Sequence, residues 1–207
     1  MSPTPVSLLS AYLCPTRVGV ARVELSGQGP GLLVLGHGAG GGTDAVDLQA
    51  AAAAAHDLGF RVALVEQPWR VRGRRVAEAP SRLDTAWIEV LAELSGTPLV
   101  VGGRSAGARV ACRTATAVGA DAVLCLAFPL QPPGGGPSRS AELSGVVVPL
   151  LVVQGDRDAF GVPDGAVVVA GADHAFAVRQ GSAPAGPVVR AAVTAWLGNL
   201  PSSREEA

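Results

Sequence analysis

Three side chains of the kinds that together make a nucleophilic catalyst follow apolar runs in this chain: Ser105, Asp158 and His174. A serine hydroxyl is a weak nucleophile until a base takes its proton, and that base works best when a carboxylate orients it. The anion that then forms must meet fixed N–H donors. We therefore expect a serine hydrolase in which Ser105 is the nucleophile, His174 the general base and then acid, and Asp158 the group that orients the histidine.

The serine lies in a glycine-bracketed turn between a predicted strand and a predicted helix. Gly103 and Gly107 stand two residues before and two residues after Ser105. A strand-to-helix turn this tight closes only when those two positions carry almost no side chain. The turn also puts the serine at a helix N-terminus, whose free N–H groups favour an oxyanion. The alternative is that Ser105 only caps the helix, since serine is a preferred N-cap residue.

Two backbone N–H groups are the candidates for an oxyanion hole. Ala106 would offer the first, because it directly follows the proposed nucleophile. The second would come from the glycine-rich loop Gly38–Gly41, which follows an earlier predicted strand. Ala39 is the favoured donor in this loop, and Gly40 is the alternative.

Other residues compete for the roles of base and acid. The chain has three histidines. His56 falls near the C-terminal end of a predicted helix, where the dipole favours a partly charged ring, and we expect it to be structural. His37 precedes the glycine-rich loop and is expected to brace it. Asp156 shares the loop of the favoured acid, and Asp173 adjoins the favoured histidine, where neighbouring side chains of an extended segment point apart.

Alternating strands and helices would position these groups. Short apolar runs suit strands that are covered on both faces, and segments with apolar residues at helical spacing separate them. The predicted strands are 18–25, 32–35, 61–66, 98–101, 122–127, 146–153 and 166–169, and the predicted helices are 45–58, 82–94, 106–117 and 187–197. This order predicts an α/β fold, a three-layer α/β/α sandwich around a mostly parallel sheet. In such a sheet functional groups gather at the carboxyl ends of the strands, and the order serine, acid, histidine is that of an α/β-hydrolase.

Composition limits the classes of protein to consider. The chain has 207 residues, of which 48% are hydrophobic and 16% charged, enough for one domain with a continuous core. We expect a single domain over residues 1–207, with loose ends over 1–10 and 201–207. The net charge of −1, without a basic block, argues against nucleic acid as a partner. All 16 basic residues are arginines, which excludes chemistry that needs a lysine.

The sequence predicts no metal, no cofactor and no membrane segment. The three cysteines, Cys14, Cys112 and Cys125, lack metal-ligand spacing, and free thiols indicate a reducing compartment. No basic leader starts the chain, and no apolar run approaches the roughly 18 residues of a membrane-spanning helix. We therefore expect a cytoplasmic protein that acts on a small-molecule ester or thioester. The oligomeric state is not predicted.

The glycine-rich loop has a second interpretation. Gly36, Gly38 and Gly41 match the dinucleotide-binding pattern G-x-G-x-x-G after a strand and before a helix, and Glu66 ends the next strand, where a carboxylate would hold a ribose. A dinucleotide-binding oxidoreductase is therefore the alternative enzyme. It is less favoured because it leaves the spacing of serine, acid and histidine unexplained.

Three residues near the predicted site are candidates for contact with substrate: His37, Trp69 and Arg104. Trp69 follows a strand at the expected sheet edge and leads into a segment with several arginines, 70–75, that would suit an anionic substrate. Solvated charge is nevertheless the ordinary state of arginine, so a plain exposed loop is the simpler interpretation of that segment.

Five motifs in one order resemble a known family, and together they span nearly the whole chain. They are His37–Gly41, Gly102–Gly107, Phe128–Gly134, Gln154–Gly161 and Ala172–Phe176. In this combination the chain resembles the small α/β-hydrolases related to dienelactone hydrolases, and within them the branch that contains hydrolase-like domains of testis-expressed and chromatin-complex proteins.

The resemblance implies a sheet whose first strands are antiparallel and a serine-hydrolase site with little or no cap domain. It departs from the commoner motif forms at Ala106 and Ala108, where Met or Gly is frequent, and at Ala159, where Pro often follows the acid. These changes would alter the pocket and leave the three catalytic candidates in place. Because the branch includes scaffold subunits, a catalytically silent interaction protein is the alternative function.

Overall fold

The structure is a computed structural model, and it describes residues 8–201. Eight strands and six helices follow one another along this part of the chain. The strands are β1 (Leu8–Thr16), β2 (Gly19–Ser26), β3 (Leu32–Gly36), β4 (Arg61–Glu66), β5 (Leu99–Arg104), β6 (Ala122–Leu126), β7 (Leu150–Gly155) and β8 (Val167–Val169). The helices are α1 (Val46–Asp57), α2 (Pro68–Val71), α3 (Pro80–Ala92), α4 (Ala106–Thr114), α5 (Ser140–Ser144) and α6 (Ala185–Gly198).

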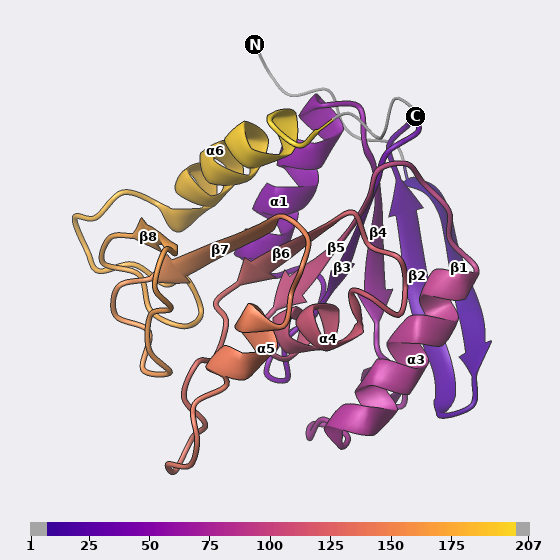
Figure 1. The fold of residues 1–207 in the computed structure, drawn as a ribbon, viewed down its shortest axis with the longest axis horizontal. Coiled ribbons are helices and arrows are strands. Elements are labelled where there is room, and N and C mark those ends of the chain that lie inside the picture. Colours follow the sequence, from indigo (N-terminus) through magenta and orange to yellow (C-terminus); the bar gives the residue numbers. More distant parts are fainter. Residues whose placement is uncertain (1–7, 202–207) are drawn as a thin grey trace.

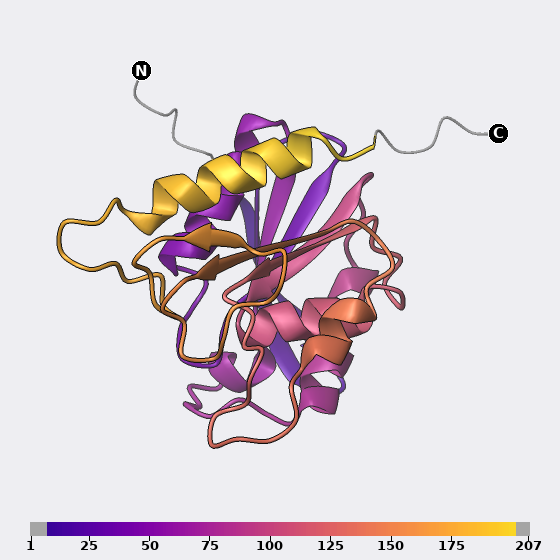
Figure 2. The same cartoon turned by 60° about the vertical axis from the view of Figure 1, so that its left-hand side comes forward.

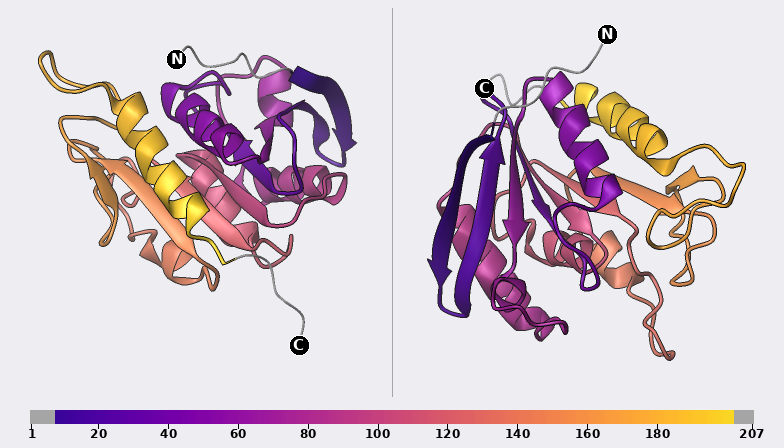
Figure 3. Two further views of the ribbon diagram at one scale, coloured as in Figure 1. Left: turned by 90° about the horizontal axis from the view of Figure 1, so that it is seen from above. Right: turned by 180° about the vertical axis from the view of Figure 1, so that it is seen from behind.

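All eight strands form one sheet in the order β1-β2-β4-β3-β5-β6-β7-β8 (Figure 1). The pairs β1–β2 and β2–β4 are antiparallel, and every later pair is parallel. The antiparallel strands β1 and β2 lie at one edge of the sheet (Figure 3). The predicted fold class, a mostly parallel sheet with antiparallel first strands, is therefore confirmed.

Helices cover both faces of the sheet and enclose two cores. On one face α1 and α6 lie side by side (Figure 2), and the alanine-rich face of α1 packs with Leu33, Leu35 and Val189. On the other face α3 and α4 pack against each other, and Trp87 and Phe128 are fully buried there. Because β3, β5 and β6 are covered on both faces, their residues are buried almost without exception, as their continuous apolar runs predict.

The structure differs from the sequence prediction at several short elements. Residues 8–10 were expected to be loose but begin β1, which is held by antiparallel pairing along β2; residues 1–7 and 202–207 lie outside the described part. The helices α2 and α5 are too short for helical periodicity to reveal. The strand expected over 146–153 begins only at Leu150.

The described residues carry no cap domain over the sheet. Connections at the carboxyl ends of the parallel strands are loops, with α2 and α5 as short helical pieces within them. None of the helices within residues 8–201 is long and apolar enough to cross a membrane.

Candidate active site

The central strand β5 delivers Ser105 into a strained turn. Ser105 has φ 54° and ψ −109°, a left-handed conformation that few residues other than glycine adopt, and α4 begins at the next residue. A Cβ on Gly107 would lie 2.3 Å from the carbonyl oxygen of Gly36, and one on Gly103 would lie 2.5 Å from the same oxygen. Glycine is therefore required at both flanking positions, because the turn packs directly on the end of β3.

Ser105 is not a helix cap in the usual sense. It occupies the N-cap position of α4, yet its side chain makes no capping hydrogen bond. Its Oγ lies instead 3.0 Å from Nε2 of His174. The interpretation of this serine as a simple helix cap is therefore wrong, and its hydroxyl faces a histidine from a distant part of the chain.

His174 lies in the loop after β8, between the serine and a carboxylate. Its Nδ1 is 2.7 Å from Oδ2 of Asp158, and the ring of Phe160 packs edge-on against the imidazole at 4.5 Å between centroids. A ring held on both sides in this way keeps Nδ1 on the carboxylate and Nε2 on the hydroxyl. The arrangement leaves Nε2 able to accept the serine proton, since the other nitrogen carries the hydrogen that faces the carboxylate.

Asp158 is buried and receives further hydrogen bonds. Gln154, at the end of β7, donates from Nε2 to Oδ2 at 2.6 Å, and the backbone N–H of Phe160 donates to Oδ1 at 2.8 Å. Gln154 is itself fully buried. Gln154 opens one of the five sequence motifs, but its role as a donor to Asp158 was not predicted, because nothing in the sequence shows which way its side chain points.

The two alternative acids are engaged elsewhere. Oδ1 of Asp156 accepts the N–H of Gly171, just after β8, at 2.8 Å. Oδ1 of Asp173 accepts the N–H groups of Ala175 and Ala177, and so closes the turn that carries His174. Of the three aspartates considered for this role, Asp158 is the one whose carboxylate contacts the histidine.

His37 supports the glycine-rich loop through hydrogen bonds of its ring. It is buried, its Nδ1 lies 2.8 Å from the carbonyl oxygen of Gly38, and its Nε2 accepts the N–H of Gln67 at 3.0 Å. Nδ1 therefore carries the hydrogen, and burial lowers the pKa of His37 below its usual value, which favours the neutral ring. Both ring nitrogens are occupied, so this histidine has no free nitrogen for the serine.

The residues expected to contact substrate are mostly enclosed by the protein. Trp69 is 2% exposed and packs against the His37 ring at 5.4 Å between centroids. Arg104 is 9% exposed, and its guanidinium donates to the carbonyl oxygen of His174. The structure thus puts all three, His37 included, beneath the loops that form the site, where they support those loops.

The proposed oxyanion donors come from two segments next to the serine, the start of α4 and the loop after β3. Ala106 is the first residue of α4, so its N–H has no partner within the helix and points out of the helix N-terminus. Ala39 and Gly40 are exposed in the loop after β3. This loop runs beside the turn Gly103–Gly107 that carries Ser105, which we call the elbow, because a Cβ on Gly38 would lie 3.3 Å from the Cβ of Ser105.

The glycine-rich loop does not have the shape of a dinucleotide site. In that fingerprint the third glycine lies at the start of the helix and lets helix and strand pack closely. Here α1 begins only at Val46, so Gly41 remains in the loop. Glu66 lies 3.5 Å from the guanidinium of Arg70.

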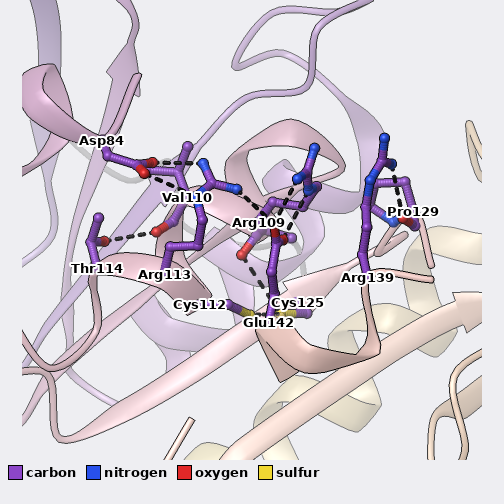
Figure 4. Close-up of polar contacts among 11 residues, drawn as sticks. Asp84, Arg109, Val110, Cys112, Arg113, Thr114, Cys125, Pro129, Arg139 and Glu142 are labelled. Atoms are coloured by element: carbon purple, nitrogen blue, oxygen red, sulfur yellow. Dashed lines mark hydrogen bonds and ion pairs between the residues drawn. The ribbon is translucent and has the colours of Figure 1, made fainter. Parts of the chain in front are cut away.

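An ion-pair network ties α4 to its neighbours behind the elbow (Figure 4). Glu142 of α5 binds Arg109 and Arg113 of α4, and Arg113 also binds Asp84 of α3. The network, which lies on the outer face of α4, holds three helices together. It pins the helix whose first N–H groups face the proposed oxyanion.

The cysteines are free, and no group of three potential metal ligands occurs within residues 8–201. Cys112 of α4 and Cys125 of β6 lie with their sulfur atoms 3.3 Å apart in the core. Hydrogen bonding to Cys112, followed by burial, raises the pKa of the Cys125 thiol well above its usual value, so it is a packing group.

The fold and the site define an α/β-type serine hydrolase. Residues 30–185 match the family described as alpha/beta hydrolase domain, and the chain belongs to this family.

Solved structures agree on the architecture. A serine hydrolase without a lid from Xanthomonas campestris has a TM-score of 0.71 at 18% identity, with 99% of each chain covered. Est1E from Butyrivibrio proteoclasticus has a TM-score of 0.73 at 14% identity, over 92% of this chain and 98% of the other. A dienelactone hydrolase from Anabaena variabilis has a TM-score of 0.69 at 14% identity, over 94% of this chain and 98% of the other. These identities establish the fold alone, and comparison with curated proteins finds no match.

Proposed function

We propose that the protein hydrolyses an ester or thioester of a small acyl group through Ser105, His174 and Asp158. The observation that carries the proposal is the continuous hydrogen-bonded path, 3.0 Å from Ser105 Oγ to His174 Nε2 and 2.7 Å from His174 Nδ1 to Asp158 Oδ2. A serine in a strained turn, a histidine and a buried carboxylate have no structural need to meet in this way. Their geometry is that of an activated nucleophile.

The first half of the reaction forms an acyl-enzyme. Ser105 Oγ attacks the carbonyl carbon while His174 Nε2 takes its proton, and the carbonyl oxygen becomes negative. The N–H groups of Ala106 and Ala39 stabilise that charge, with the N-terminus of α4 behind the first of them. The bond to the leaving group then breaks, and His174 returns the proton to the departing oxygen or sulfur.

The second half releases the acid. Water gives a proton to His174 Nε2 and its oxygen attacks the acyl carbon. When the new tetrahedral anion collapses, the bond to Ser105 Oγ breaks and the histidine returns the proton to the serine. Asp158 stays ionised throughout and stabilises the imidazolium that forms twice in the cycle.

The narrow space beside the elbow favours a small acyl group over a long one. A cavity of about 10 Å³ adjoins Ala106 and is walled by aromatic and aliphatic side chains, Trp69, Leu83, Trp87 and Val110 among them. This volume holds about one water-sized sphere. A long acyl chain has no room on this side of the serine.

The order of the five motifs further supports a place near the hydrolase-like domains of testis-expressed and chromatin-complex proteins. Residues 1–207 are expected to form a single domain, and the free cysteines fit a reducing compartment such as the cytoplasm.

The test that separates an enzyme from a catalytically silent fold is covalent labelling with a fluorophosphonate, which reacts with activated serines. Wild type is expected to be labelled, and Ser105→Ala and His174→Ala are expected to lose labelling. Ser144→Ala, which changes an exposed serine on α5, is the matched control and should label fully.

Failure of folded wild type to react would contradict the proposal and favour an interaction protein. Labelling that persists in Ser105→Ala would show that another residue is the nucleophile.

A further inference from the structure

Arg104 is a buried cation beneath the proposed active site. It is the residue between Gly103 and Ser105, and its side chain is only 11% exposed. Long charged side chains are rarely enclosed in this way without a specific partner. The guanidinium must therefore be held by groups around the elbow, and its contacts identify them.

The guanidinium touches both loops that face the serine. Its Nη2 donates to the carbonyl oxygen of His174 at 2.9 Å. Its Nη1 lies against the glycine-rich loop, since a Cβ on Gly38 would be 3.2 Å from it and a Cβ on Gly41 would be 3.5 Å away. One rigid, planar group therefore spans the loop of the histidine and the loop of the proposed oxyanion donor.

Asp47 is the counter-charge, and it comes from a third element. It lies in the first turn of α1, is fully buried, and has Oδ2 at 3.3 Å from Nε of Arg104. Within the described residues neither carboxylate oxygen makes a hydrogen bond of ordinary geometry. Burial raises the pKa of Asp47 to about 6, despite the opposing effect of Arg104. The ionised carboxylate is thus costly to bury, and stability alone does not account for the pair.

We propose that Arg104 is a positioning residue that joins the His174 loop to the glycine-rich loop, with Asp47 balancing its charge inside the protein. This inference rests on the proposed function, because it concerns the geometry of His174 in that reaction. A histidine held only by its own loop would be free to drift from Ser105. The bond to its carbonyl oxygen fixes its backbone, while Asp158 fixes its ring.

The test measures the rate of fluorophosphonate labelling and the turnover of p-nitrophenyl acetate in four variants of the Arg104–Asp47 pair and in one control variant. Arg104→Gln is expected to slow labelling and reduce kcat by about 10- to 100-fold with little change in KM, since small displacements of a catalytic group have effects of this size. Arg104→Lys, which keeps a cation that reaches one of the two partners, is expected to regain part of the rate. Asp47→Asn keeps the bond to the His174 carbonyl and is expected to lose less.

The double variant Asp47→Asn/Arg104→Gln separates positioning from charge balance. It buries no charge, so it is expected to melt at a higher temperature than Arg104→Gln while its labelling stays slow. Arg61→Gln is the matched control, because Arg61 also donates to two carbonyl oxygens, of Gly29 and Ser95, on loops that join the elements at the amino ends of β3 and β5. It is expected to lose stability without a change in labelling rate.

Two results would overturn the inference. One is a labelling rate in Arg104→Gln within twofold of wild type. The other is full recovery of that rate in the double variant, which would reduce the arginine to a partner for Asp47. Neither result resembles failure of the proposed function, in which wild type itself is not labelled.

Discussion

The buried carboxylate of Asp47 predicts an unusual dependence of stability on pH. Its pKa rises from 3.8 to about 6 on folding, chiefly because burial disfavours the charged form. A tenfold change in a proton equilibrium corresponds to about 1.4 kcal/mol, so this rise corresponds to about 3 kcal/mol. Below pH 3.8 the carboxyl is protonated in both states and contributes nothing.

Between those two pKa values the folded protein keeps a proton that the unfolded chain has released. The contribution of this group to stability therefore falls as pH rises. The destabilisation by the buried, ionised carboxylate is complete only well above pH 6. Asp47→Asn has no such group. The free energy of unfolding of wild type, relative to that of the variant, should fall by about 2 kcal/mol between about pH 4 and pH 7, and by about 3 kcal/mol over the whole titration.

Urea unfolding followed by circular dichroism at several pH values measures this difference directly. The constant offset between the two proteins includes the loss of the partner of Arg104, so the slope is the quantity to compare. Glu78→Gln is a control of opposite sign: the hydrogen bond from Arg82 lowers the pKa of Glu78, so the stability it contributes is lost as pH falls. Parallel curves for wild type and Asp47→Asn would refute the reasoning.

Three further substitutions test the positions that shape the site. Gly107→Ala pushes a methyl group to 2.3 Å from the carbonyl oxygen of Gly36, and is expected to lower the free energy of unfolding by about 3 kcal/mol in urea titrations. Gln154→Leu removes a donor from Asp158 while filling the same space, and is expected to slow fluorophosphonate labelling about tenfold, the equivalent of about 1.4 kcal/mol. Because Gln154 also donates to the carbonyl oxygens of Phe128 and Gly161, the melting temperature is expected to fall as well. His37→Phe leaves a buried backbone N–H unpaired and is expected to cost about 1–3 kcal/mol of stability; an unchanged urea midpoint would show that the loop does not need this brace.

Most of the fold follows from local patterns. The apolar runs at β3, β5 and β6 and the helical spacing around Trp87 predict these elements and a parallel sheet, because each pattern reflects burial on two faces or on one. β1 was not predicted. Its Leu8–Thr16 segment is a sheet edge whose pairing with β2 depends on the hairpin and on no pattern of its own.

The site, too, contains residues that local patterns predict and residues that they do not. Ser105, Asp158 and His174 are predicted from motifs, and the structure brings their side chains together. Asp47 and Gln154 could not be predicted, since one lies in a helix and the other in a strand, and both acquire their partners only when distant segments pack. Arg104 was expected to contact substrate because it directly precedes Ser105. The sequence does not show the direction of its side chain, which the structure turns into the protein.

The elbow also has a bearing on how the chain folds. The backbone of Ser105 is held in its strained form by β3, whose partner residues on β5 are far away in sequence, as in the pair Leu32 and Leu99. Such non-local pairing forms late, because loop closure must come first. A refolding chain therefore acquires this backbone geometry only at assembly of the central strands. A reagent specific for that serine would then report, in a refolding time course, the arrival of the native topology and not of helices alone.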